Sequence, residues 1–123
     1  MKKILIVEDE ALLLEVLRDE FTHAGFSALL AKDGSEGLAT AQKELPDVIL
    51  VDILMPKMDG ITMLNKIRQN SKLANTPAII LTNLNDNKTI EQALQSGVYD
   101  FLVKSDWNPK DLVKRVKEKL NLK

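Results

Sequence analysis

Three short apolar runs lie along the chain, and each is continuous rather than alternating with polar residues. They cover residues 4–7, 48–51 and 78–81 and are rich in β-branched side chains. Strands that are buried on both faces of a parallel sheet have this pattern, so we predict three central strands. Two segments of mixed character, residues 26–31 and 99–103, suit strands at the edges of the same sheet.

Amphipathic stretches fill the intervals between these runs. Apolar residues there recur at steps of three and four, which is typical of one face of a helix. We expect five helices, marked by Leu12, Leu13, Val16, Leu17 and Phe21; by Leu38, Ala41 and Leu45; by Ile61, Leu64 and Ile67; by Ile90, Ala93 and Leu94; and by Leu112, Val113, Val116 and Leu120. Gly25, Pro46 and Gly97 are the expected stops, and Asp59 and Asn108-Pro109 the expected starts.

The chain therefore alternates strand and helix five times. With right-handed crossovers, five β-α units in sequence predict a doubly wound α/β domain. The length of 123 residues suits one domain with one core, and no repeat or linker interrupts it, so we expect a single domain over residues 1–123.

Composition excludes several classes of function. Seventeen basic against eighteen acidic residues give a net charge of −1, which argues against a dedicated binder of nucleic acid or anionic membrane. Without cysteine there is no disulfide or thiolate site, and the single His23 cannot build a multi-histidine zinc site. The first apolar run ends at Glu8, too early for a signal peptide or a membrane span, so we expect a cytoplasmic protein.

The chemistry of the chain is concentrated where the strands end. In open α/β sheets, ligands bind beyond the carboxyl ends of the strands. The second strand ends in Lys32 and Asp33, which we expect to lie farther out. The side chains expected to meet at this edge are Glu8, Asp9 and Glu10 after the first strand, Asp52 after the third, Thr82 after the fourth and Lys104 after the fifth.

Three carboxylates that meet at one edge repel one another unless a cation joins them. Oxygen ligands favour a hard cation such as Mg²⁺, which keeps waters or a substrate phosphate in its shell. An added ammonium and hydroxyl suit a phosphoryl group in transfer, whose oxygens each need a partner. An aspartate needs no adjacent base to act as the nucleophile.

These residues resemble the receiver domain of two-component response regulators, over essentially the whole chain. The resemblance rests on Glu8-Asp9, on VDILMPKMDG at residues 51–60, on Leu81-Thr82 and on GVYDFLVK at residues 97–104. It implies a flavodoxin-like (βα)5 fold with a parallel five-stranded sheet in the order 2-1-3-4-5, as in a chemotaxis regulator.

The resemblance also implies the roles of the acidic residues. Asp52 is expected to be the phosphoacceptor, which takes a phosphoryl group from a sensor histidine kinase or a phosphotransfer protein. Glu8, Asp9, Asp52 and the backbone carbonyl of Leu54 are expected to bind Mg²⁺, with Mn²⁺ as the alternative cation. The protein is then a signalling switch that catalyses only its own phosphorylation and slow dephosphorylation, and not an enzyme with a separate substrate.

The remaining roles concern the conformational change. Thr82 is expected to be the switch hydroxyl, Lys104 the ion-pair partner of the phosphoryl group, and Phe101 the switch aromatic. The surface of the fourth helix, fifth strand and fifth helix is expected to bind a downstream target or a second copy of the chain. Direct binding of nucleic acid or membrane is not expected.

Three positions depart from the common pattern of the family. Glu8 replaces an aspartate without changing the charge, and Asn83 follows the switch hydroxyl where a small residue is usual. Ser105 replaces a proline that follows a cis bond, and a non-proline cis bond costs about 2.5–4 kcal/mol, so both isomers of the Lys104–Ser105 bond stay open. Leu54 and Leu84 flank the path of a hydrolytic water and cannot bind it, which predicts slow dephosphorylation.

Three other classes share parts of this pattern. A flavin or nucleotide module on this fold needs a phosphate-binding loop after the first strand, where this chain has acids. A pseudo-receiver would keep the fold without phosphorylation, although all the key positions are filled here. A haloacid-dehalogenase-type phosphatase needs a second aspartate where this chain has Leu54.

Overall fold

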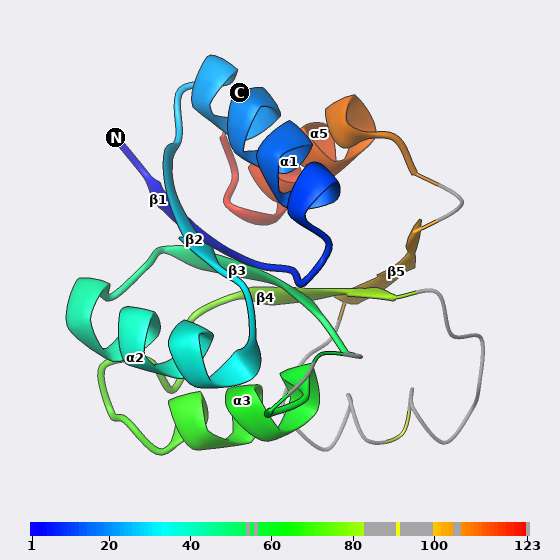
Figure 1. Cartoon of the computed structure of the whole chain (residues 1–123). Helices are drawn as coiled ribbons and strands as arrows, with labels where there is room; N and C mark the ends of the chain where they lie inside the picture. Colours follow the sequence, from blue (N-terminus) through cyan, green and yellow to red (C-terminus); the bar gives the residue numbers. More distant parts are fainter. Residues whose placement is uncertain (54, 56, 83–90, 92–99, 105–106, 123) are drawn as a thin grey trace.

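The computed structural model describes residues 1–53, 55, 57–82, 91, 100–104 and 107–122. Five parallel strands form one sheet in the order β2-β1-β3-β4-β5 (Figure 1). Their bounds are β1 Lys3–Val7, β2 Ser27–Ala31, β3 Val48–Asp52, β4 Ala78–Thr82 and β5 Asp100–Val103. This order confirms the flavodoxin-like arrangement that the resemblance implied, with the two mixed segments at the edges.

Four helices lie within the described residues. Their bounds are α1 Ala11–His23, α2 Gly34–Glu44, α3 Gly60–Arg68 and α5 Pro109–Lys119. The residues that marked the fourth predicted helix, Ile90, Ala93 and Leu94, lie outside the described part of the chain. None of the described helices is long and apolar enough to cross a membrane.

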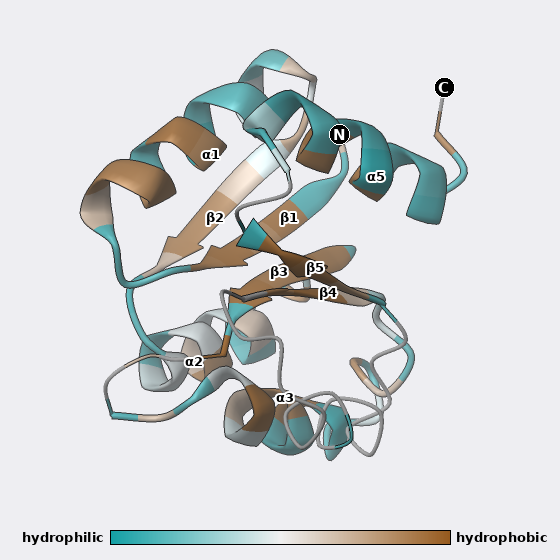
Figure 2. Ribbon diagram, turned by 90° about the vertical axis from the view of Figure 1, so that its right-hand side faces the viewer, coloured by the Kyte–Doolittle hydropathy of each residue, from teal (hydrophilic) through white to brown (hydrophobic). Residues whose placement is uncertain are grey.

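The helices cover both faces of the sheet, with α1 and α5 on one face and α2 and α3 on the other (Figures 1 and 2). Because successive side chains of a strand point to opposite faces, each central strand supplies both cores. Leu5 and Ile49 pack toward α2 and α3, whereas Ile4 and Leu50 pack toward α1 and α5. The continuous apolar runs are the result of this two-sided burial.

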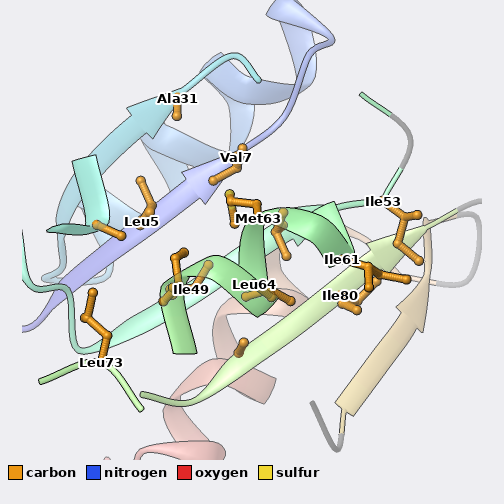
Figure 3. Packing of buried hydrophobic residues seen from close by; sticks show 14 residues of the cluster. Leu5, Val7, Ala31, Ile49, Ile53, Ile61, Met63, Leu64, Leu73 and Ile80 are labelled. Atoms are coloured by element: carbon orange, nitrogen blue, oxygen red, sulfur yellow. The ribbon is translucent and has the colours of Figure 1, made fainter. Parts of the chain in front are cut away.

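Helix α3 illustrates how the sequence sets a helix boundary. The Asp59 carboxylate accepts a hydrogen bond from the Thr62 N–H at 2.8 Å and so caps the first turn. Ile61 and Leu64 then lie against the sheet, beside Ile80 of β4 (Figure 3). Burial of each such side chain contributes about 1.5–3 kcal/mol. The predicted start at Asp59 is confirmed, as is the start of α5 at Asn108-Pro109, where a capping box forms.

Helix α1 faces the core with part of the predicted set: Leu17 and Phe21 are buried as expected, and Leu13 packs partly against the core. Its buried residues are Leu14, Leu17 and Phe21. Leu12 and Val16 were expected on the apolar face, but they are 80% and 46% exposed. Figure 2 shows the N-terminal half of α1 as a hydrophobic segment at the surface.

Candidate functional site

Three carboxylates meet at the carboxyl edge of the sheet. Strands β1 and β3 are neighbours with Val7 opposite Val51, so the residues that follow, Glu8 and Asp52, also lie side by side. Both are nearly buried, whereas Asp9 is exposed. One oxygen from each of the three carboxylates lies within 4.8 Å of the others. The expected acidic cluster is therefore present.

The Lys104 ammonium lies inside this cluster. Its Nζ is 2.5 Å from Glu8 Oε1 and 3.0 Å from Asp52 Oδ2, and a weaker contact joins it to Glu10 at 3.9 Å. Lys104 directly follows β5, whose end is separated from that of β3 by β4, so its long side chain spans the end of β4. The lysine thus neutralises part of the negative charge of the cluster.

Burial changes the protonation chemistry of this group of side chains. Loss of water around Glu8 raises the pKa of its carboxyl from 4.5 to about 7, and the nearby Asp52 charge adds to this effect against the hydrogen bond from Lys104. Burial alone would lower the pKa of Lys104, but its bonds to Glu8 and Asp52 outweigh burial and raise it. The ammonium therefore stays charged, and Glu8 is the group that titrates near neutral pH.

The donor set fits a hard divalent cation. All three side chains offer carboxylate oxygens, which Mg²⁺ prefers, and one of the three carboxylates opens to solvent. Glu8 Oε1 is buried, and its partner among the described residues is the Lys104 ammonium. A divalent cation in the cluster would give this oxygen a second positively charged partner.

Two other predicted site residues lie on β4 and β5. Thr82 is the last residue of β4, and its backbone pairs in register with Val103, the residue before Lys104. Phe101 lies in β5, is half-buried and packs against the core on the α2 and α3 face. Leu54, Asn83, Leu84 and Ser105 were also singled out from the sequence, and all four lie outside the described residues.

One contact near this edge, between Asp33 and Lys57, was not predicted from the sequence. Asp33, expected farther out, is 9% exposed and caps α2 by accepting a hydrogen bond from the Glu36 N–H at 2.8 Å. Its other oxygen lies 3.7 Å from Nζ of Lys57, in the segment between β3 and α3. The pair Asp33-Gly34 carried a signal of a helix start, but nothing in the sequence pointed to Lys57 as its partner.

Comparison with known proteins gives consistent matches. Among curated proteins, the chain is 37% identical to a probable transcriptional regulator, ycf27, of Guillardia theta, over 94% of this chain and 44% of that protein. Among solved structures, the chemotaxis protein CheY4 of Vibrio cholerae is 32% identical with a TM-score of 0.90, over 96% of this chain and 98% of that one. A CheX–CheY–BeF3–Mg complex from Borrelia burgdorferi is 30% identical with a TM-score of 0.85, over 97% and 89%.

The chain spans less than half the length of curated regulators such as ycf27. A family model for the response regulator receiver domain matches residues 4–117, which is nearly the whole chain. The chain therefore belongs to the family of response regulator receiver domains, the phosphorylation-dependent signalling domains of two-component systems.

Proposed function

We propose that Asp52 accepts a phosphoryl group from a phosphohistidine of a sensor kinase or phosphotransfer protein, in a reaction that depends on Mg²⁺. The observation that carries this proposal is the Lys104 ammonium, which Glu8 and Asp52 share. The carboxylate of Asp52 lies 3.0 Å from Lys104 Nζ, and Glu8 and Asp9 stand within metal-binding distance. A nucleophile, a fixed cation and a cation-binding oxygen set are thereby combined in one small volume.

In this reaction one bond to phosphorus forms and one breaks. An oxygen of Asp52 forms the new bond to phosphorus, and the phosphorus–nitrogen bond of the phosphohistidine breaks, leaving its electron pair on the imidazole. Mg²⁺, bound by Glu8, Asp9, Asp52 and the Leu54 carbonyl, would neutralise charge on the phosphoryl oxygens. Lys104 keeps its charge and contacts a phosphoryl oxygen in place of the carboxylate that has reacted.

A small phosphodonor tests the proposal without the unknown kinase. We expect acetyl phosphate or phosphoramidate with Mg²⁺ to add one phosphoryl group, detected by intact mass, and we expect EDTA to prevent it. Asp52→Asn should remove the addition, whereas Asp19→Asn, at an exposed position of α1, should keep it. An unmodified wild-type protein, or a modified Asp52→Asn variant, would refute the assignment.

The same site is proposed to drive a switch. Phosphorylation draws the Thr82 hydroxyl toward the phosphoryl oxygens, and Phe101 turns farther inward into the vacated space. The half-buried state of Phe101 supports this, because its ring has both exposed and buried surface to exchange. Phe101→Ala should leave phosphorylation by acetyl phosphate intact and weaken binding of the target or a second copy on the surface of the fourth helix, β5 and α5. NMR shifts confined to α1 and α2 on addition of beryllofluoride would contradict the switch.

The phosphodonor protein is proposed to dock on α1. This helix begins directly after the acidic residues, and Leu12 and Val16, one turn apart, expose apolar surface there. Leu12→Ala should slow transfer from a phosphotransfer protein but not from acetyl phosphate. Leu45→Ala is the matched control, since Leu45 is an exposed leucine at the opposite edge of the sheet. Equal transfer rates for the two variants would exclude this docking surface.

The proposal is completed by Mn²⁺ as an alternative cation, by action in the cytoplasm, and by output through a protein target rather than by direct contact with nucleic acid or membrane. The cellular response that follows phosphorylation is a property of the whole protein.

A further inference from the structure

The segment that follows Asp52 is closed tightly at its base. It runs from residue 53 to residue 59, between β3 and α3, and the structure describes residues 53, 55 and 57–59 of it. The Gly60 N–H donates a hydrogen bond to the Ile53 carbonyl at 2.9 Å. A Cβ at Gly60 would overlap the carbonyl oxygen of Asp52, so the two backbones touch where only hydrogen fits. Gly60, the residue that follows this segment, is therefore in direct contact with the backbone of Asp52.

Met58, near the end of the same segment, lies against the start of α2. A Cβ at Gly34, the first residue of α2, would overlap the carbonyl oxygen of Met58 and lie close to its carbonyl carbon and Cβ. Helices α2 and α3 lie side by side on the same face of the sheet (Figure 1). The Met58 backbone thus approaches α2 as closely as a glycine allows.

A second contact and a strained residue adjoin this approach. Lys57 has a φ of 68°, a left-handed conformation that side chains other than glycine rarely adopt. Its ammonium lies 3.7 Å from Asp33, but Lys57 is 73% exposed, so this ion pair alone holds little. Strained residues persist only where their surroundings fix them, and the backbone of Met58, the residue next to Lys57, lies against Gly34.

We propose that the α2 corner, Asp33 and Gly34, positions Lys57 and Met58 and through them the phosphoacceptor. Gly34 is then a positioning residue for phosphoryl transfer, which acts on Asp52 through Met58 and Gly60. This inference rests on the proposed function for its kinetic consequence. Its structural consequence, a segment pinned against α2, stands independently of phosphorylation.

The decisive variant is Gly34→Ala, with Ser35→Ala as its control in the same helical turn. Alanine is the better helix former, so without the Met58 contact the substitution would be harmless. With the contact, Met58 has to shift, and a displacement of about 1 Å costs about 100-fold in rate. We expect the maximal rate of phosphorylation by acetyl phosphate at saturating Mg²⁺ to fall at least about tenfold, and Ser35→Ala to match the wild type.

A measurement without metal or phosphodonor tests the structural consequence of the proposal separately from its kinetic consequence. Amide hydrogen exchange of Gly60 reports the bond to Ile53 in the metal-free protein, with the Leu5 amide of β1 as the internal reference. We expect Gly34→Ala to accelerate exchange at Gly60 at least about tenfold and to leave Leu5 unchanged. Wild-type exchange at Gly60 in this variant overturns the proposal, even if phosphorylation is slow.

Lys57→Gly keeps the proposal testable if Gly34→Ala does not fold. Glycine relieves the left-handed strain, so the melting temperature should stay level or rise, while the greater backbone freedom at position 57 should accelerate exchange at Gly60 and slow phosphorylation at least about threefold. A residue with a merely structural role would move stability and rate in the same direction. If the wild type itself takes up no phosphoryl group, the proposed function fails, and Gly60 exchange still decides whether the α2 corner holds the segment.

Discussion

The metal-free protein should lose stability as the pH rises from 4.5 to about 7, because Glu8 then has to give up a proton in a buried position. In the unfolded chain this carboxyl titrates at its ordinary pKa of 4.5, and in the folded chain burial raises that pKa to about 7. Between these values the folded state binds more protons than the unfolded state, so the free energy of unfolding falls with rising pH. The contribution is complete below pH 4.5 and is lost above about pH 7.

The size of the effect follows from the two pKa values. A change from 4.5 to about 7 corresponds to an upper limit of about 3 kcal/mol. The exposed Asp9 side opens the cluster to water, which screens the Glu8 charge, so we expect about half of this limit, roughly 1–2 kcal/mol.

Urea unfolding in EDTA measures this directly. Trp107, the single tryptophan of the chain, packs against the core under α1 and α5 and reports unfolding by its fluorescence. The free energy of unfolding of wild type minus that of Glu8→Gln should decline between about pH 5 and pH 8, and saturating Mg²⁺ should abolish the decline because the metal holds Glu8 ionised. The control Glu15→Gln, at an exposed position of α1, should give a difference that is independent of pH. A flat difference for Glu8→Gln, or one that rises with pH, would refute the reasoning.

Three further outcomes follow from the same geometry. Asp9→Asn removes one of three mutually repelling carboxylates, so it should raise the metal-free stability by about 0.5–1 kcal/mol and abolish stabilisation by Mg²⁺. Calorimetry in EDTA and in Mg²⁺ tests both effects. A lower melting temperature of the variant in EDTA would contradict repulsion among the carboxylates. The hydrogen bonds from Lys119 and Arg115 lower the pKa of Asp100, although burial opposes this effect. Asp100→Asn should therefore cost about 1–3 kcal/mol of stability at neutral pH. Urea titrations should show this cost shrinking as the pH falls below 3.8. The double variant Leu54→Asn, Leu84→Glu should shorten the lifetime of the phosphorylated protein by at least about tenfold, measured after removal of the donor, and an unchanged lifetime would end the argument from these leucines.

The strands were predictable because their burial leaves a simple mark in the sequence. A strand covered on both faces needs apolar residues at consecutive positions, and residues 4–7 of β1, 48–51 of β3 and 78–81 of β4 are apolar and buried. The face of α1 was not predictable in the same way. Leu12, Leu13 and Leu14 are consecutive, so more than one helical face is apolar. The choice of Leu14 over Leu12 depends on how the helix packs against the sheet and α5, which is a tertiary property.

The acidic cluster was predictable from the rule that parallel strands end at one edge. Contacts across that edge were not, because they depend on strand order and on the length of side chains. The order 2-1-3-4-5 came from the family resemblance, and with that order Lys104 reaches Glu8 across the ends of β4 and β3. The contact between Asp33 and Lys57 was missed for the same reason: β2 lies beyond β1, yet Lys57 extends back from the segment after β3.

The charge of the cluster explains why metal and phosphoryl group should bind together. When Glu8 is ionised, three carboxylates face one ammonium among the described residues, which leaves two negative charges without compensation. A divalent cation supplies that compensation. Under the proposed function, conversion of Asp52 to its acyl phosphate would replace one negative charge with about two, so a bound cation would be held more strongly afterwards than before. Because such coupling is reciprocal, Mg²⁺ would favour the phosphorylated form by the same factor, and removal of the cation would remove this stabilisation.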